Sequence, residues 1–440
     1  MNGWSTLVTK SVKRFAAPPL SSHDSKNNFL IGLRGFFVIQ SFLHTFLLVF
    51  APASVVHSAN AQEGSHSSNL HKALKFVSIL FWNDGIIYSA FIILSARTIC
   101  IPFMKDRTRL SIAGSIFRRG LRLWFPVAVA LAITTSIFQA TGYKYLDDFA
   151  KDTSNISILV PYKIDNALIY FNSVFNLFWV TTRFSDQAGS YAFPGQMMWV
   201  INVIYMQSFT VYMTMVIIPY TRPSWRVKGA IFFIITAWWV QSWAWYSITG
   251  LLLADLVTNM DFKAKAQRGI KVWRSITCPS YFAYAVSLAG GFVMQYLWAA
   301  WRPEYRDEEL IAHGALYYTG GLNEDFDVKQ PQARDDNYLV LLGFFLCVET
   351  SDIIQWALAN PLFVYLGRRS LSWFLVQSVV VYTMGIKLFQ TLHMTSEVAA
   401  TAACFFAILA ATAVGSEIFY RAVEVPSHAL SYTIFDWIRD

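Results

Sequence analysis

A guanidinium group and an imidazole lie in the first long apolar segment of the chain, residues 29–50. An imidazole can accept a proton near neutral pH, so His44 is a natural candidate for a general base. A guanidinium binds phosphate or stabilises a developing oxyanion, and Arg34 would lie roughly 15 Å from His44 along a helix. The alternatives are a histidine that only hydrogen-bonds to a neighbouring helix and an arginine that reaches the lipid headgroups.

Further charged residues flank or interrupt later apolar segments. Arg118, Arg119 and Arg122 lie at the start of the third segment, where they would bind phosphate groups or simply mark the cytoplasmic side. Carboxylates inside a membrane are costly and tend to face a cavity, which makes Asp84 a candidate catalytic residue. The pair Glu349 and Asp352 is a further candidate, or else it hydrogen-bonds to a neighbouring helix or marks the early end of its own helix.

The composition indicates that these residues are positioned by membrane-spanning helices. The chain has 440 residues, of which 55% are hydrophobic and only 14% are charged, against about 25% charged in soluble domains. The net charge of +8 fits basic cytoplasmic loops better than a nucleic-acid partner. The four cysteines have no paired spacing, so we expect neither a disulfide framework nor a metal site.

Apolar segments long enough to cross a bilayer predict an all-α integral membrane protein with about ten transmembrane helices in one bundle. Residues 1–28 would be a cytoplasmic segment, 29–426 the transmembrane domain with an outer loop at 302–336, and 427–440 a cytoplasmic tail after a helix that ends before Pro426. Residues 229–262 predict a hairpin that turns near 241–245, and GRRS at 367–370 predicts a cytoplasmic turn. The predicted spans are 29–50, 73–99, 121–140, 196–219, the two arms of that hairpin, 279–301, 337–359, 371–389 and 396–418.

Three stretches together resemble the membrane-bound acyltransferase 3 family, whose members transfer acetyl or other acyl groups to hydroxyls. They are LRGFFVIQSFLH at 33–44, FRRGLRLWFPVAVA at 117–130, and PLFVYLGRRSLSWFLVQ at 361–377 followed by FYRAVEVP at 419–426. A weaker similarity lies in AFIILSAR at 90–97. The order and spacing of these stretches, rather than any one of them, carry the resemblance, which covers residues 30–426.

The sequence departs from the family pattern at three positions. The family's first-helix arginine and histidine are eleven residues apart and share a helix face, whereas Arg34 and His44 are ten apart, which turns His44 roughly 80° away. Ser41 and Thr45 lie on the face of Arg34 instead. The family glutamate of the fourth helix is Ile204 here, and the histidine that follows the basic turn is Gln377, which cannot exchange a proton at neutral pH.

The resemblance implies a membrane O-acyltransferase that takes acetyl-CoA, or another acyl-CoA, from the cytoplasmic side. The acceptor would be a hydroxyl of a hydrophobic small molecule, and the endoplasmic reticulum or another internal membrane the default location in a eukaryote. The alternatives on the same scaffold are a transporter and a membrane isomerase or cyclase that uses the carboxylates. The candidate catalytic residues are His44, Arg34 and Asp84, and the candidate coenzyme-binding residues are Arg118, Arg119 and Arg122.

Overall fold

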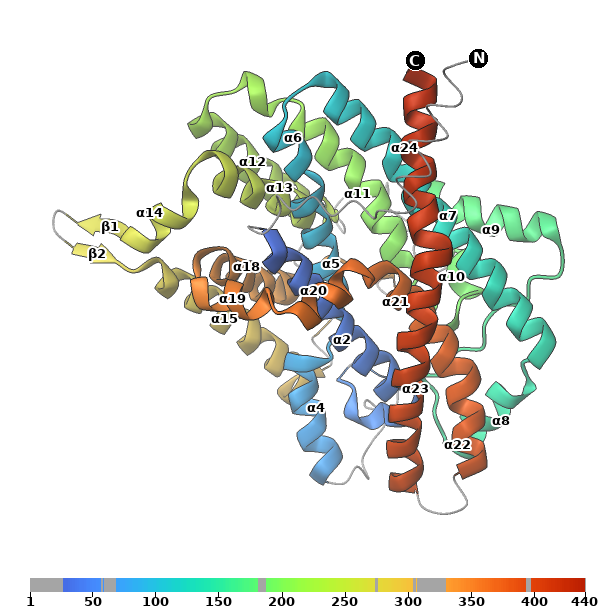
Figure 1. The fold of residues 1–440 in the computed structure, drawn as a ribbon. Coiled ribbons are helices and arrows are strands. Elements are labelled where there is room, and N and C mark those ends of the chain that lie inside the picture. The colour runs from blue at the N-terminus through green and yellow to red at the C-terminus, as the bar shows by residue number, and fades with distance from the viewer. Residues whose placement is uncertain are drawn as a thin grey trace, which may run out of the picture.

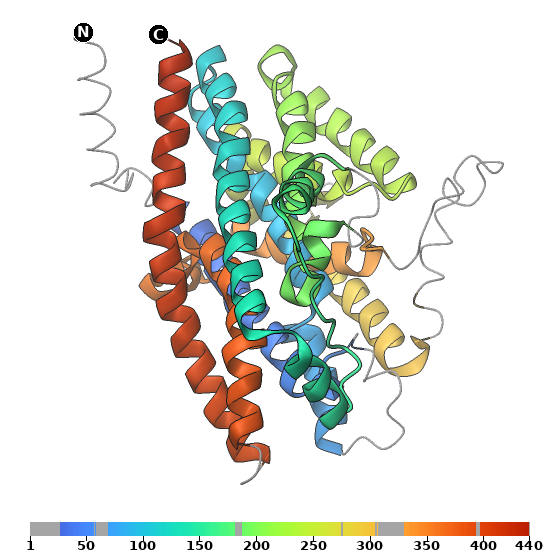
Figure 2. The same ribbon diagram turned by 90° about the vertical axis from the view of Figure 1, so that its right-hand side faces the viewer.

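The chain folds into a bundle of helices of very different lengths (Figures 1 and 2). The computed structural model describes residues 27–56, 58, 69–180, 187–273, 276–303, 306, 330–392 and 397–439. Most of the predicted outer loop, 302–336, and residues 1–26 of the predicted N-terminal segment lie outside the described residues.

The described residues of the first half of the chain form eleven α-helices, several of them short. They are α2 (Asn28–Phe50), α4 (Asn69–Phe81), α5 (Asp84–Ile99), α6 (Ile101–Lys105), α7 (Arg109–Thr141), α8 (Lys144–Asp152), α9 (Ala167–Trp179), α10 (Ala188–Tyr191), α11 (Trp199–Met215), α12 (Pro223–Trp239) and α13 (Ala244–Asn259). Helix α7 begins at Arg109, so the basic stretch before the predicted third span belongs to a helix and not to a loop.

The second half begins with a short helix and a small antiparallel hairpin, and it ends with the longest helix run. Its elements are α14 (Phe262–Arg268), β1 (Ile270–Trp273), β2 (Ile276–Cys278), α15 (Ser280–Tyr296), the π-helical turn η5 (Leu297–Trp301), α18 (Asp335–Thr350), α19 (Asp352–Leu358), α20 (Pro361–Arg368), α21 (Ser370–Val380), the π turn η7 (Val381–Gly385), α22 (Ile386–Leu392), α23 (Glu397–Phe419), the π turn η8 (Tyr420–Glu424) and α24 (Val425–Arg439). The β1–β2 hairpin projects from one side of the bundle, at the left of Figure 1.

The lengths of the helices are those of a helical membrane protein. Among the described residues, seven helices are long and apolar enough to cross a bilayer, or eight if one bent pair counts as a single span. The predicted count of ten also needs α12 and α13, which form the predicted hairpin and turn at residues 240–243. These two helices have 17 and 16 residues, so each is somewhat shorter than the ~30 Å hydrocarbon layer at ~1.5 Å per residue.

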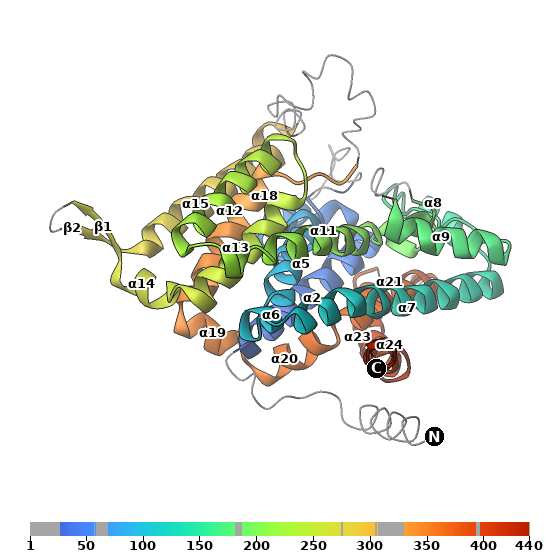
Figure 3. The same ribbon diagram turned by 90° about the horizontal axis from the view of Figure 1, so that it is seen from above.

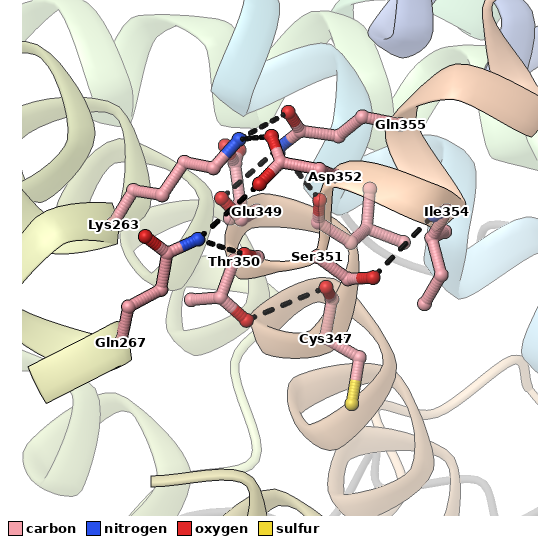
Figure 4. Close-up of polar contacts among 10 residues, drawn as sticks. Lys263, Gln267, Cys347, Glu349, Thr350, Ser351, Asp352, Ile354 and Gln355 are labelled. Carbon is pink, nitrogen blue, oxygen red and sulfur yellow. Dashed lines mark hydrogen bonds and ion pairs between the residues drawn. The ribbon is translucent and has the colours of Figure 1, made fainter. Parts of the chain in front are cut away.

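The predicted span at 337–359 is not one straight helix. The axis bends by 95° between α18 and α19. Ser351 stands at the break and caps α19, because its Oγ accepts a hydrogen bond from the Ile354 N–H at 3.4 Å. The ammonium group of Lys263 donates to Asp352 and to Gln355 beyond the break (Figure 4). A capped, charge-bearing turn therefore interrupts an otherwise apolar run.

The prediction that the last helix ends before Pro426 is wrong, because the helix continues to Arg439. Helices α23 and α24 and the turn η8 form one run of 42 residues from Val398 to Arg439, the long red helix of Figures 1 and 2. Proline lacks an N–H group, so Pro426 cannot complete the backbone hydrogen bond expected in the interior of such a run. The π turn just before it shifts the helix register. Residues 427–439 of the predicted tail thus form most of α24, which packs against α7.

Helix α20 packs directly on α2 near the middle of the bundle (Figure 1). A Cβ atom on Gly35 would collide with the carbonyl oxygen of Phe363, and one on Gly367 would collide with that of Ile31. Only glycine permits such a close backbone approach. The predicted turn at GRRS is confirmed as a turn between two helices, since α20 ends at Arg368 and α21 begins at Ser370.

Candidate functional site

A cavity of about 260 Å³ lies where α2, α7 and α24 meet α5, α11 and the turn between α20 and α21. Figure 3, viewed from above, shows α2, α7, α20, α21 and α24 gathered in this part of the molecule. Four guanidinium groups line the cavity, those of Arg34, Arg119, Arg122 and Arg368. Its other walls are largely apolar, with side chains such as Phe91, Ile204 and Phe374. The cavity therefore combines a cationic lining with apolar walls.

Two of the four arginines are held by hydroxyl groups of α5 and α11. Arg34 donates from Nη2 to Thr98 Oγ1 at 2.9 Å. Arg119 donates from Nε to Ser208 Oγ at 2.9 Å and from Nη2 to Ser95 Oγ at 2.7 Å. Hydroxyls fix the orientation of a guanidinium but do not neutralise its charge. The positive charge of these two groups remains available to an anion in the cavity.

The other two arginines are directed to the cavity without such anchors. Arg122 and Arg368 are exposed, and neither makes a hydrogen bond or an ion pair with another residue in the described part of the chain. The guanidiniums of Arg97 and Arg226, in contrast, contact the carboxylates of Glu349 and Asp255 at 2.7 and 3.0 Å. The cavity is thus lined by arginines that lack a carboxylate within ion-pair distance.

Two ionisable groups of the last helix complete the lining. Glu424, at the end of the π turn, accepts a hydrogen bond from Ser372 Oγ through Oε2. His428 lies four residues farther on and therefore on the same helix face. The sequence interpretation missed both residues as site residues, because it ended the last helix before Pro426. The spacing of Glu424 and His428 would have signalled a shared face if that helix had been continued.

Of the three predicted coenzyme-binding arginines, the structure brings two to the cavity. Arg119 and Arg122 line it, but the guanidinium of Arg118 lies over the ring of Tyr432, 4.1 Å from its centroid, and 5.7 Å from that of Phe435. A cation–π contact of this kind attaches α7 to α24. Arg118 therefore contributes to the packing of the last helix.

His44 and Arg34 do not line the same cavity. The His44 ring is 6% exposed, and its Nδ1 lies 3.2 Å from the carbonyl oxygen of Trp82, to which it can donate. The ring packs edge-on against Tyr88, whose ring in turn meets that of Phe374 at the cavity wall. His44 thus bonds to the backbone at the break between α4 and α5, with aromatic rings between it and the cavity. This is the arrangement of a histidine that connects two helices.

The two positions at which the family resemblance calls for a histidine meet in this structure, but neither holds one. Gln377 is fully buried and donates from Nε2 to Ser41 Oγ at 2.8 Å and to Thr45 Oγ1 at 3.4 Å. Thr45 is the residue eleven positions after Arg34. A neutral amide and two hydroxyls therefore occupy this place, and none of them accepts a proton at neutral pH.

The predicted carboxylate candidates lie away from the cavity. Asp84 is the first residue of α5, where the helix dipole favours a negative charge. Its neighbour Asn83 caps this helix by accepting from Gly85 N at 3.0 Å and donates to Gln295 Oε1 at 2.6 Å. Asp84 is thus in a position that suits a structural role at the start of a helix.

Glu349 and Asp352 have separate partners on different elements. Glu349 is 1% exposed and pairs with Arg97 of α5 at 2.7 Å. Asp352 is 75% exposed and pairs with Lys263 before the β hairpin (Figure 4). Gln267 also donates to Asp352 Oδ2 at 3.4 Å. The two carboxylates therefore stabilise contacts between helices and do not form one acidic site.

Comparison of the chain with family models, with curated proteins and with solved structures finds no match. Within the described residues, no group of three or more histidine, cysteine, aspartate or glutamate side chains is arranged to hold a metal ion.

Proposed function

We propose that this protein is an integral membrane O-acyltransferase that binds the reactive end of an acyl-CoA in the basic cavity. One observation carries the proposal. The three stretches that resemble the acyltransferase 3 family are up to several hundred residues apart in the chain, yet residues from all of them line a single cavity. They are Arg34 of the first stretch, Arg122 of the second, and Arg368 and Glu424 of the two parts of the third. If the stretches resembled the family only because they are apolar helices, their charged residues would not need to meet at one cavity.

The charges in the cavity suit an acyl-CoA donor. Guanidinium forks bind phosphate oxygens, and they also stabilise the oxyanion that forms when an alcohol attacks a thioester. The donor would enter from the side of the basic start of α7, which we expect to be cytoplasmic. Arg122 and Arg368, which lack partners in the described chain, are the candidates for phosphate binding, and Arg34 for stabilising the oxyanion.

The size of the cavity favours a short acyl group. A cavity of about 260 Å³ is below the ~300–1,000 Å³ range of pockets that enclose a drug-sized ligand. It can enclose an acetyl thioester and part of the pantetheine arm, while the nucleotide remains outside. The apolar walls at Phe91, Ile204 and Phe374 suit an acceptor with a hydrophobic body. A small hydrophobic alcohol in an internal membrane is therefore the proposed acceptor.

The carboxylate-dependent alternatives receive less support from the geometry. A transporter or an isomerase built on Asp84, Glu349 and Asp352 needs these groups to face one substrate site. Glu349 is closed into an ion pair, Asp352 pairs on the surface, and Asp84 begins a helix. Ile204 and Gln377 stand where the family has a glutamate and a histidine, and these two losses still favour a protein on the same scaffold without transferase activity. The vesicle assay for ester formation also tests this alternative.

The experiment uses the full chain in phosphatidylcholine vesicles, because this lipid has no free hydroxyl. The vesicles receive labelled acetyl-CoA and one of three acceptors: a long-chain primary alcohol, an isoprenoid alcohol or a sterol. We expect a labelled ester and an equal amount of free CoA thiol. Coenzyme affinity should fall by about 10–100-fold in Arg122→Ala, the loss expected for ~1.5–3 kcal/mol from a charge-assisted hydrogen bond. Arg109→Ala, at the exposed start of α7, is the matched control.

Two results would contradict the proposal. One is a wild-type protein that shows no measurable affinity for CoA. The other is an equal loss of affinity in the Arg122 and Arg109 variants, because it would indicate a diffuse surface charge instead of a site in the cavity.

A further inference from the structure

We propose that the imidazole of His428 is the general base that removes the proton from the acceptor hydroxyl. This inference rests on the proposed acyl transfer and names the group that performs its proton step. Two histidine side chains are described in the structure, those of His44 and His428. Of these, only His428 lines the cavity that contains Arg34.

The surroundings of His428 hold its ring in place but leave its nitrogens available. The ring stacks on that of Tyr432, with centroids 5.3 Å apart and planes inclined by 28°. Tyr432 is itself fixed by the guanidinium of Arg118, 4.1 Å from its centroid. Neither ring nitrogen of His428 hydrogen-bonds to another residue in the part of the chain that the structure describes. A stacked imidazole without a protein partner is oriented and still free to bond to a hydroxyl in the cavity.

Glu424, the carboxyl group on the same wall, suits a supporting role. Its Oε2 already accepts a hydrogen bond from Ser372, and it lies one helical turn from His428. The place where the family resemblance calls for histidines contains Ser41, Thr45 and Gln377, which cannot serve as bases. His428 is thus the imidazole that the last helix brings to the cavity when it continues past Pro426.

The His428 imidazole accepts the proton of the acceptor O–H, and the oxygen forms a bond to the carbonyl carbon of the thioester. The carbonyl electrons move to its oxygen, which a guanidinium stabilises. When the carbonyl reforms, the C–S bond breaks and its electron pair leaves with sulfur. The imidazolium then gives its proton to this thiolate, so that the products are the ester and CoA thiol.

The test measures ester formation and coenzyme affinity in parallel, in the vesicles described above. We expect His428→Gln to lower turnover by about 10²–10⁴-fold, the contribution of general base catalysis, while CoA affinity stays within about threefold, because the base does not hold the donor. His428→Ala should regain turnover when free imidazole is added, since a small base can enter the space that is left. Leu430→Ala, an exposed residue on the same helix, is the control and should retain wild-type turnover.

The outcomes separate this inference from the function on which it rests. If the wild type forms an ester and His428→Gln still turns over within about threefold of it, the inference is wrong and the proposed function stands. Loss of turnover without rescue by imidazole, together with loss of CoA affinity or of thermal stability, would show a structural role and would also overturn it. The same holds if turnover depends on His44 instead. A wild type that neither binds CoA nor forms an ester would overturn the proposed function itself.

Discussion

Arg97 and Glu349 form an ion pair in the interior of the bundle, with 2.7 Å between Nε and Oε1 and side chains that are 2% and 1% exposed. The pair joins α5 to α18 at the end where α18 breaks. Arg97 Nη1 and Glu349 Oε2 have no hydrogen-bond partner, so each charge depends on the other for its compensation.

We predict that Glu349→Gln destabilises the protein by about 3–5 kcal/mol, because it leaves a buried guanidinium without a counter-charge. The double variant Arg97→Met/Glu349→Leu, in which neither charge remains, should lose less. Thermal unfolding followed by intrinsic fluorescence checks both. Asp352→Asn, which breaks an exposed pair, is the control, and its effect should stay below about 1 kcal/mol. If the double variant were less stable than Glu349→Gln, desolvation of an unpaired charge could not be the cause.

The sequence predicted the helical class and most helix positions well, because long apolar runs depend only on local composition. The α12–α13 hairpin and the turn at GRRS were predicted for the same reason. The break at Ser351 was considered only as the alternative that Glu349 and Asp352 mark an early helix end, since an N-cap serine inside an apolar run is a weak local signal. Such a break depends on distant partners such as Lys263.

The candidate site was predicted only in part. Residue spacing shows which side chains share a face of one helix, but it does not show which side chains of other helices pack against that face. Helical spacing correctly indicated that His44 is turned away from Arg34. It could not indicate that Tyr88 packs against that imidazole, nor that Arg119 would reach serines of α5 and α11. His428 was missed because Pro426 was interpreted as a helix end, and only the π turn before it shows why the helix continues.

Because α2 and α20 approach each other closely, we predict that adding a single methyl group between them lowers the stability of the protein strongly. Gly35→Ala or Gly367→Ala places Cβ against a backbone carbonyl that cannot rotate away, so the helices must separate. Overpacking of this kind typically costs about 1–3 kcal/mol or more. If the cavity binds CoA as proposed, the substitution should also weaken that binding, because Gly367 lines the cavity and Arg368 follows it.

Gly229→Ala is the matched control for this pair of variants. A Cβ at Gly229 meets no atom within 4 Å, and replacing glycine by alanine inside a helix stabilises by up to ~1 kcal/mol. Thermal unfolding should therefore move in opposite directions for Gly229→Ala and Gly35→Ala. A Gly35→Ala protein as stable as the wild type would contradict the close packing of the two helices.

The hydrogen bond between His44 and Trp82 predicts a structural role that can be measured without an acceptor. His44→Leu leaves the Trp82 carbonyl without its donor at the break between α4 and α5, at a cost of about 1–3 kcal/mol. His44→Asn keeps an N–H donor near the position of Nδ1 and should recover part of this loss. Equal stability of the two variants would show that the Trp82 carbonyl does not need this donor.

If acyl transfer takes place in this cavity as proposed, Ile204 should limit the length of the acyl chain, because it forms part of the cavity wall. Ile204→Ala removes three carbon atoms and lengthens the apolar space next to the donor. Discrimination by about one methylene is worth ~1–3 kcal/mol, so the ratio of butyryl to acetyl transfer should rise by about 10-fold or more. Ile235→Ala, an exposed position on α12, removes the same atoms away from the cavity and should leave the ratio unchanged. An unaltered ratio in Ile204→Ala would place the acyl group elsewhere than in this cavity, even if Arg122 proved to bind the coenzyme.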